Sequence, residues 1–175
     1  MISTTPSPTA YTNEPRAWIS RFTLLPLRLF LGVTFLYAGL DKLTDLTFLT
    51  AAGDGSVAQQ MEAVRNAAAV PGLVDLALGA PVAFGTAIAY GELAVGLGVL
   101  IGLFGRLAAA GGALISLSLW LTISWSTTPY YYGNDLVYLM AWLPLVLAGT
   151  PTLSVDGLMW AAKRSRRDLT DLTPR

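Results

Sequence analysis

Four long runs of hydrophobic residues dominate the sequence, and each is about as long as one membrane crossing. They cover residues 22–40, 81–104, 107–125 and 132–149. About 20 residues of α-helix cross the ~30 Å hydrocarbon core of a bilayer. The runs are continuous and do not alternate with a period of two, so membrane strands do not fit them. The pattern predicts an all-α membrane protein, a bundle of four transmembrane helices.

The polar stretch between the first two runs carries its own shorter pattern. Its apolar positions are spaced by four, three and four residues, and they are Val57, Met61, Val64 and Ala68. This spacing predicts a short amphipathic helix on the extracytoplasmic face, ended by Pro71 and Gly72. Residues 73–78 then either lie in the interface or turn back towards the bundle.

Both ends of the chain are polar. Residues 1–15 are rich in Ser, Thr and Pro, so we expect a disordered tail over residues 1–20. No basic region opens the chain as in a signal peptide, so the first run is expected to stay as an anchor. One membrane domain then covers residues 21–162. Residues 153–162 form either an interfacial helix or a plain flank of the basic tail, 163–175.

Positive charges set the expected orientation. With a cytoplasmic N-terminus, eight basic residues fall inside: Arg16, Arg21, Arg106, Lys163, Arg164, Arg166, Arg167 and Arg175. Lys42 and Arg65 fall outside. The positive-inside rule therefore predicts that both termini face the cytoplasm. We expect a multi-pass protein of the bacterial cytoplasmic membrane. Tyr130–Tyr132 then lie at the outer interface, either as an anchor or as a surface on which a quinone or lipid headgroup stacks.

Composition narrows the function classes. Hydrophobic residues make up 54% of the chain, charged residues 13%, and the formal net charge is zero, so we expect no nucleic-acid partner. The chain has neither Cys nor His, which removes disulfides and the usual protein ligands of haem, copper and iron–sulfur clusters. No metal-ligand motif occurs. Redox chemistry would therefore need a partner or a mobile carrier such as a quinone, with no cofactor held by protein ligands.

Charged residues inside the hydrophobic runs are the first site candidates, because each is costly in lipid unless it is paired or hydrated. Glu92 lies near the middle of the second run and Arg28 lies within the first. An ion pair between them would either form a polar ligand or proton-transfer site or only fix the helix register.

A second set of polar residues lies at the outer ends of the runs. Lys42 follows the first run, and Asn134 and Asp135 begin the fourth, with Tyr37 and Tyr90 nearby on their own helices. They form either a pocket that opens outward or ordinary helix caps and interface contacts. Glu92 and Asp135 are the candidate proton-transfer residues. The candidate ligand-binding residues are Arg28, Tyr37, Lys42, Tyr90, Glu92, Asn134 and Asp135.

Small residues recur every four positions in the second run, at Ala94, Gly98 and Gly102. Ala108 and Gly112 are similarly spaced in the third run. Small residues let membrane helices approach closely, so we expect the second and third helices to pack tightly.

Three segments together resemble the DoxX-like membrane proteins, including the DoxD type. They are RLFLGVTFLYAGLDKL (28–43), GELAVGLGVLIGLFGRLAA (91–109) and LSVDG (153–157). The positions that match the family pattern are Arg28, Gly39, Lys42, Glu92, Gly96, Arg106, Ser154, Asp156 and Gly157. The resemblance covers residues 22–157. It implies a four-helix membrane bundle linked to respiratory or sulfur redox chemistry, since DoxD-like members are subunits of a thiosulfate:quinone oxidoreductase.

Three functions remain open at this point. The first is an accessory subunit of a larger quinone-linked respiratory or oxidoreductase complex, lining a quinone or lipid pocket. The second is direct quinone reduction, with Glu92 and Asp135 handling protons and Arg28 or Lys42 holding an anionic donor such as thiosulfate. The third is a small carrier, which would need an oligomer to form a path. Whether the chain is itself an enzyme stays undecided.

Overall fold

The computed structural model describes residues 22–150, 153–157 and 159, and every regular element in these residues is helical. The elements, in chain order, are α2 (Leu25–Thr44), α3 (Val57–Val64), α4 (Pro71–Gly79), α5 (Pro81–Ile101), α6 (Gly105–Thr122), the 3-10 helix η1 (Tyr130–Tyr132) and α7 (Asn134–Ala148). The predicted all-α class is therefore confirmed. The predicted tails, 1–20 and 163–175, lie outside the described residues, as do residues 158 and 160–162 of the predicted segment 153–162. Residues 155–157 and 159 of that segment are helical.

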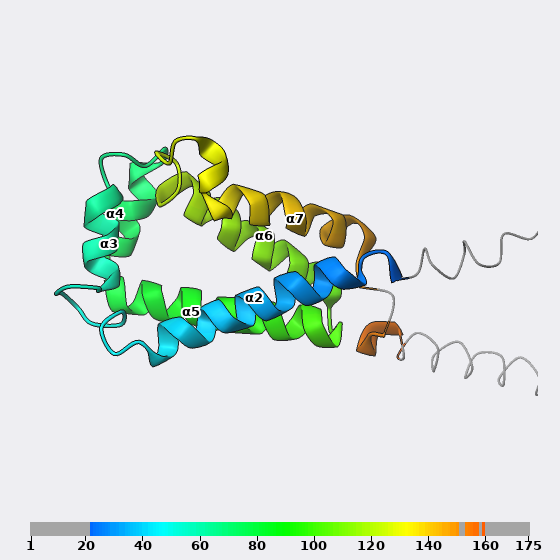
Figure 1. Cartoon of the computed structure of the whole chain (residues 1–175). Coiled ribbons are helices and arrows are strands. Elements are labelled where there is room, and N and C mark those ends of the chain that lie inside the picture. The colour runs from blue at the N-terminus through cyan, green and yellow to red at the C-terminus, as the bar shows by residue number, and fades with distance from the viewer. Residues whose placement is uncertain (1–21, 151–152, 158, 160–175) are drawn as a thin grey trace, which may run out of the picture.

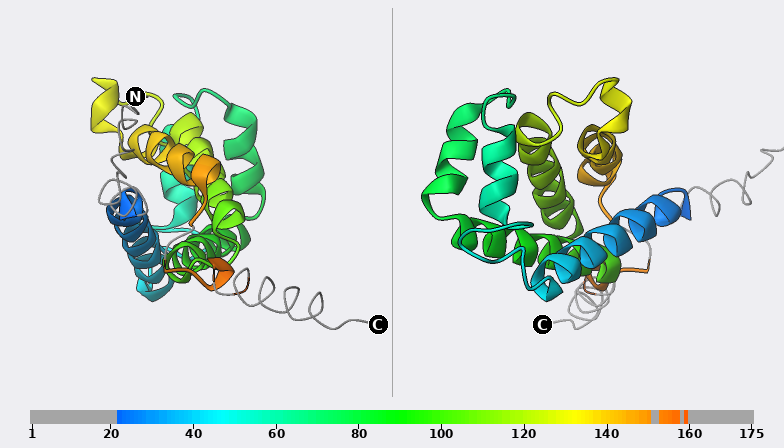
Figure 2. Two further views of the ribbon diagram at one scale, coloured as in Figure 1. Left: turned by 90° about the vertical axis from the view of Figure 1, so that its right-hand side faces the viewer. Right: turned by 60° about the vertical axis from the view of Figure 1, so that its left-hand side comes forward.

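The four long helices form two antiparallel pairs (Figure 1). Helix α2 lies along α5, and α6 lies along α7, while α5 also contacts α6. The two pairs diverge towards one end of the bundle, where α3 and α4 pack on α5 and α6. Residues 153–157 lie at the opposite end, beside the turn between α5 and α6, as the two rotated views also show (Figure 2).

The four long helices differ in how plainly they qualify as membrane crossings. Within the described residues, α5 with 21 residues and α6 with 18 are long and apolar enough to cross a bilayer. Helix α2 has 20 residues but carries Arg28, Asp41 and Lys42. Helix α7 has only 15 residues, or about 22 Å. By length and composition, α5 and α6 are thus the two described helices able to cross a membrane.

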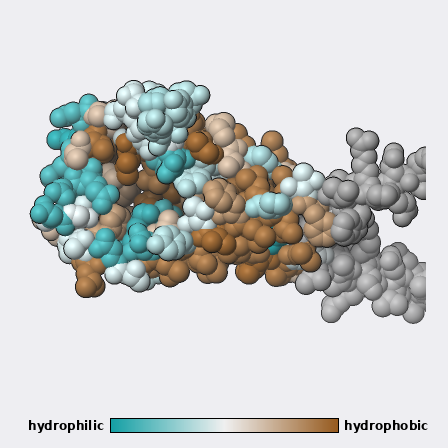
Figure 3. All heavy atoms as spheres, in the orientation of Figure 1, coloured by the Kyte–Doolittle hydropathy of each residue, from teal (hydrophilic) through white to brown (hydrophobic). Residues whose placement is uncertain are grey.

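The outer surface of the long helices is apolar. Large hydrophobic side chains point outward from all four, among them Phe30, Val33 and Leu40 of α2, Leu97 and Ile101 of α5, Leu107 and Leu114 of α6, and Met140 and Leu147 of α7. Hydrophilic residues gather at the end of the molecule that carries α3 and α4 (Figure 3). Exposed apolar surface on this scale is typical of a protein that lies in lipid.

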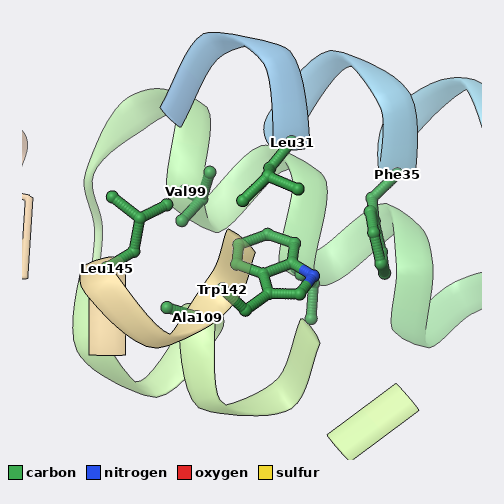
Figure 4. Packing of buried hydrophobic residues seen from close by; sticks show 7 residues of the cluster. Leu31, Phe35, Val99, Ala109, Trp142 and Leu145 are labelled. Atoms are coloured by element: carbon green, nitrogen blue, oxygen red, sulfur yellow. The ribbon is translucent and has the colours of Figure 1, made fainter. Parts of the chain in front are cut away.

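The core lies where the two helix pairs meet. Trp142 of α7 is fully buried among Leu31, Phe35, Val99, Ala109 and Leu145 (Figure 4). Gly112 of α6 lies directly under the indole, so a side chain at this position would overlap the ring. The ring of Phe35 meets the indole edge-on, with 4.9 Å between the ring centroids.

The closest helix contact is between α2 and α5, and two glycines make it possible. A Cβ atom added at Gly39 would lie 2.6 Å from the carbonyl oxygen of Ala89, and one added at Gly96 would lie 2.7 Å from the backbone nitrogen of Leu36. Both obstacles are backbone atoms, which cannot rotate away. The two helices therefore touch through their main chains at these two points.

The predicted small-residue stripe has a more modest role. Gly98 does face Ala108 of α6, where an added Cβ would lie 3.0 Å from the Ala108 methyl carbon. Ala94 is exposed, and Gly102 ends α5 in the left-handed conformation with φ of 67°. Small residues at every fourth position of α5 therefore predict one contact between α5 and α6 that the structure contains. They do not predict the closer contact between α2 and α5.

The segment between α2 and α5 forms two short helices, where one was predicted. The buried side chains of Val57 and Met61 confirm the expected apolar face of α3. That helix ends at Val64, and Pro71 begins α4, because proline has a helical φ and needs no N–H partner in a first turn. Residues 73–78 lie in α4, whose buried Val74 packs in the same cluster as Met61.

We expect Gly96→Ala to lower the free energy of unfolding by about 1–3 kcal/mol, because the methyl group must push α2 away from α5. Gly91→Ala is the matched control on the same helix, since its Cβ would meet only Ile115 at 3.4 Å. Thermal unfolding of both variants in detergent tests this. Equal stability of the two variants would contradict the main-chain contact.

Candidate functional site

Glu92 forms its ion pair with Lys42, across the contact between α5 and α2. The lysine Nζ donates to both carboxylate oxygens, at 3.0 Å to Oε1 and 2.8 Å to Oε2. The Glu92 side chain is only 4% exposed and that of Lys42 is 23% exposed. Gly39 lies one turn before Lys42 and against Ala89 and Leu93, so the close helix approach brings the lysine within reach of Glu92.

A second carboxylate, from the other helix pair, lies within electrostatic range of this ion pair. Asp135 lies in the first turn of α7, where the hydroxyl of Ser124 donates to its Oδ2. Asp135 interacts electrostatically with both Glu92 and Lys42. We call Lys42, Glu92 and Asp135 the polar cluster. With all three groups ionised, its charges sum to −1.

Arg28 lies elsewhere, and this corrects the proposed Arg28–Glu92 pair. Its guanidinium donates to the carbonyl oxygens of Val99 and Leu100, each at 2.6 Å, and to that of Leu153 at 3.2 Å. Val99 lies about 10 Å along α5 from Glu92. Because α2 and α5 are antiparallel, the start of α2 lies beside the end of α5, so Arg28 satisfies carbonyls at that helix terminus.

The LSVDG segment meets Arg28 at the turn between α5 and α6. Asp156 accepts hydrogen bonds from the backbone N–H groups of Phe104 at 3.1 Å and Gly105 at 3.0 Å, and its own N–H donates to the Gly102 oxygen at 3.1 Å. Helix α6 begins at Gly105 without a capping side chain of its own. Asp156 therefore supplies the cap from about fifty residues later in the chain.

The remaining candidates do not join the polar cluster. Tyr37 and Tyr90 are 70% and 59% exposed, so both point away from the helix contact. Asn134 is exposed, and the residue that precedes α7 as its N-cap is Gly133. Of the seven candidate ligand-binding residues, the structure thus groups three, which are Lys42, Glu92 and Asp135.

Ser124 is a partner of the polar cluster that was not predicted from the sequence. It lies just beyond α6 and eleven positions before Asp135, so the chain must fold back through η1 to bring the two together. The one available signal was a hydroxyl residue at the end of the third hydrophobic run.

The chemistry open to the polar cluster is proton exchange and hydrogen bonding. An ammonium group donates hydrogen bonds, while each carboxylate accepts them or carries a proton. In the part of the chain that the structure describes, no group of three or more His, Cys, Asp or Glu side chains could hold a metal ion.

Comparison with known proteins agrees with the sequence resemblance. The DoxX family model matches residues 23–125, which includes Lys42 and Glu92 and stops before Asp135 and the LSVDG segment. Searches among curated proteins and among solved structures found no match. The family match covers more than half of the chain, and the helices are those of a membrane-type protein. The chain therefore belongs to the DoxX family.

Proposed function

We propose that this chain is a four-crossing subunit of the bacterial cytoplasmic membrane that serves a quinone-linked redox complex. In this role its polar cluster binds the quinone head group and exchanges protons with it. The observation that carries the proposal is the Lys42–Glu92 ion pair, in which the Glu92 side chain is only 4% exposed and Asp135 of the second helix pair lies within electrostatic range.

Helices α2 and α7 act as membrane crossings in this proposal, and their contacts support this role. Arg28 and Lys42 of α2 both bond to α5, while the opposite side of α2 shows Phe30, Val33 and Leu40 outward. Helix α7 is short, but η1 precedes it with three exposed tyrosines. Tyrosines of this kind anchor a helix end at the headgroup level.

Quinone chemistry fits the composition of the polar cluster. Reduction of a quinone to a quinol takes two electrons and two protons. The Lys42 ammonium can donate a hydrogen bond to a quinone carbonyl, and Glu92 and Asp135 can deliver or accept the protons. The electrons are assigned to a partner subunit, since this chain has no Cys or His with which to hold a haem or an iron–sulfur cluster.

The charges favour this accessory role over direct oxidation of thiosulfate. A dianion would meet a cluster whose fully ionised charge is −1, with Lys42 already engaged by Glu92. Arg28, the other cation proposed for an anionic donor, is engaged at the far end of α5. The polar cluster thus suits a neutral ligand that exchanges protons.

The four-crossing topology is testable with single cysteines, because the chain has no cysteine of its own. We expect Asn66→Cys, between α3 and α4, to react with an impermeant maleimide added to intact cells. Thr23→Cys and Met159→Cys should react only after the membrane is permeabilised. If residues 23 and 66 were labelled from the same side, α2 would not cross the membrane. If residues 66 and 159 were labelled from the same side, α5, α6 and α7 together would not make an odd number of crossings.

The accessory role predicts a stable partner. Extraction of the tagged chain from native membranes in mild detergent should co-purify a second protein in fixed stoichiometry, and that protein should carry a redox centre visible in its absorption spectrum. A clean monomer or homo-oligomer, obtained at several detergent strengths, would count against the role.

Glu92→Gln should slow quinone reduction by the purified complex by about 10²-fold, because the amide cannot carry the transferred proton. Glu62→Gln, at an exposed position on α3, is the matched control and should leave the rate unchanged. Stopped-flow absorbance of the quinone measures both. An unchanged rate in a folded Glu92→Gln complex would remove Glu92 from the proton path.

A further inference from the structure

Two polar atoms in the interior of the bundle lack a hydrogen-bond partner among the described residues. They are the indole Nε1 of Trp142, in a residue that is 0% exposed, and the hydroxyl Oγ of Ser116, in a residue that is 1% exposed. A third such atom, Oγ1 of Thr150, lies apart from them beside Gly105. Buried donors without partners are rare in folded proteins, since each loses its bond to water on folding. The two groups on neighbouring helices indicate a site that a ligand atom or a water fills.

These two groups lie at the same depth, inward of the polar cluster. Ser124 and Asp135 are hydrogen-bonded to each other and so align the ends of α6 and α7. Ser116 of α6 precedes Ser124 by eight residues, and Trp142 of α7 follows Asp135 by seven residues. Each therefore lies about 10–12 Å further into the bundle. The indole also packs over Gly112, one turn from Ser116.

The indole N–H points back along the bundle. In Figure 4 the nitrogen of Trp142 points in the direction that leads from Leu31 to Phe35 along α2. The same direction leads on to Lys42. The ring of Phe35 stands edge-on beside the indole and gives this part of the interior an apolar side.

We propose that the ligand site extends from the polar cluster inward to Trp142 and Ser116, which bind the deep carbonyl oxygen of the quinone ring. This inference rests on the proposed function. A 1,4-quinone carries two acceptor oxygens at opposite ends of a flat ring, so a site that orients it needs donors at both ends. Lys42 supplies the outer donor, and the Trp142 N–H and Ser116 O–H supply the inner ones.

The assignment gives each end of the ring a different environment. The outer oxygen meets an ammonium group and two carboxylates, which can move protons. The inner oxygen meets an indole N–H, which donates a hydrogen bond but releases no proton at neutral pH. Protons therefore enter the ring from the outer end, and Trp142 is a binding residue rather than a proton donor.

The test uses the full chain in detergent, with a short-chain ubiquinone as the probe and isothermal titration calorimetry as the measurement. We expect Trp142→Phe, which keeps an aromatic ring but removes the N–H, to weaken binding about fivefold. Ser116→Ala, which improves the helix propensity of α6, should weaken binding about two- to fivefold.

Two control variants match these changes in chemistry. Trp120→Phe alters a tryptophan whose ring lies tilted against that of Trp125 near the end of α6, and Ser118→Ala removes a hydroxyl that already donates to the Ile115 oxygen. Both controls should bind the quinone as the unaltered chain does. In addition, the carbonyl band of bound ¹³C-labelled quinone should shift in infrared difference spectra of Trp142→Phe and stay in place in Trp120→Phe.

The outcomes separate this inference from the proposed function. Quinone binding that weakens in Glu92→Gln but not in Trp142→Phe or Ser116→Ala would overturn the inference and leave the function standing, with a water satisfying the two groups. No quinone binding by the unaltered chain, alone or with its partner, would overturn both. Equal weakening in the control variants would also overturn the inference, because the effect would then be a general loss of structure.

Discussion

The approach of α2 to α5 through their main chains is the constraint on which the site depends. Gly39 and Gly96 remove the side chains that would keep the helices apart, and the resulting separation lets the Lys42 ammonium reach the Glu92 carboxylate at 2.8 Å. A buried carboxylate without a partner would be strongly destabilising in a low-dielectric interior. The glycines are therefore part of the site, although neither bears a functional group.

Each of the two helix pairs supplies different groups to the site. The α2–α5 pair holds the ion pair, while the α6–α7 pair brings Asp135, Ser124, Ser116 and Trp142. The groups that could meet a ligand therefore come from both pairs, and the two pairs diverge towards the end that carries α3 and α4 (Figure 1). A small relative movement of the pairs would change the distance between Asp135 and Lys42 while leaving the Lys42–Glu92 bond intact.

The helical class and the location of the hydrophobic helices were predictable from the sequence, because continuous apolar runs of this length form helices in lipid. The importance of Glu92 and Lys42 was also visible, because charge near lipid is costly unless it is paired. The pairing was not predictable, since depth along a run says nothing about the register between helices. The antiparallel register puts Arg28 beside Val99 and Leu100. Ser124 was missed for a similar reason, because its contact with Asp135 depends on a turn whose geometry no local pattern encodes.

The capping of α6 by Asp156 has a consequence for biosynthesis. The turn from Gly102 to Gly105 lies in the middle of the chain, yet the oxygens that satisfy its two N–H groups come from a residue synthesised about fifty positions later. Helices α5, α6 and α7 must therefore leave the ribosome before this junction acquires its final hydrogen bonds. A chain that stops ahead of residue 156 would lack the carboxylate that accepts from the Phe104 and Gly105 N–H groups, so the start of α6 would lose its cap.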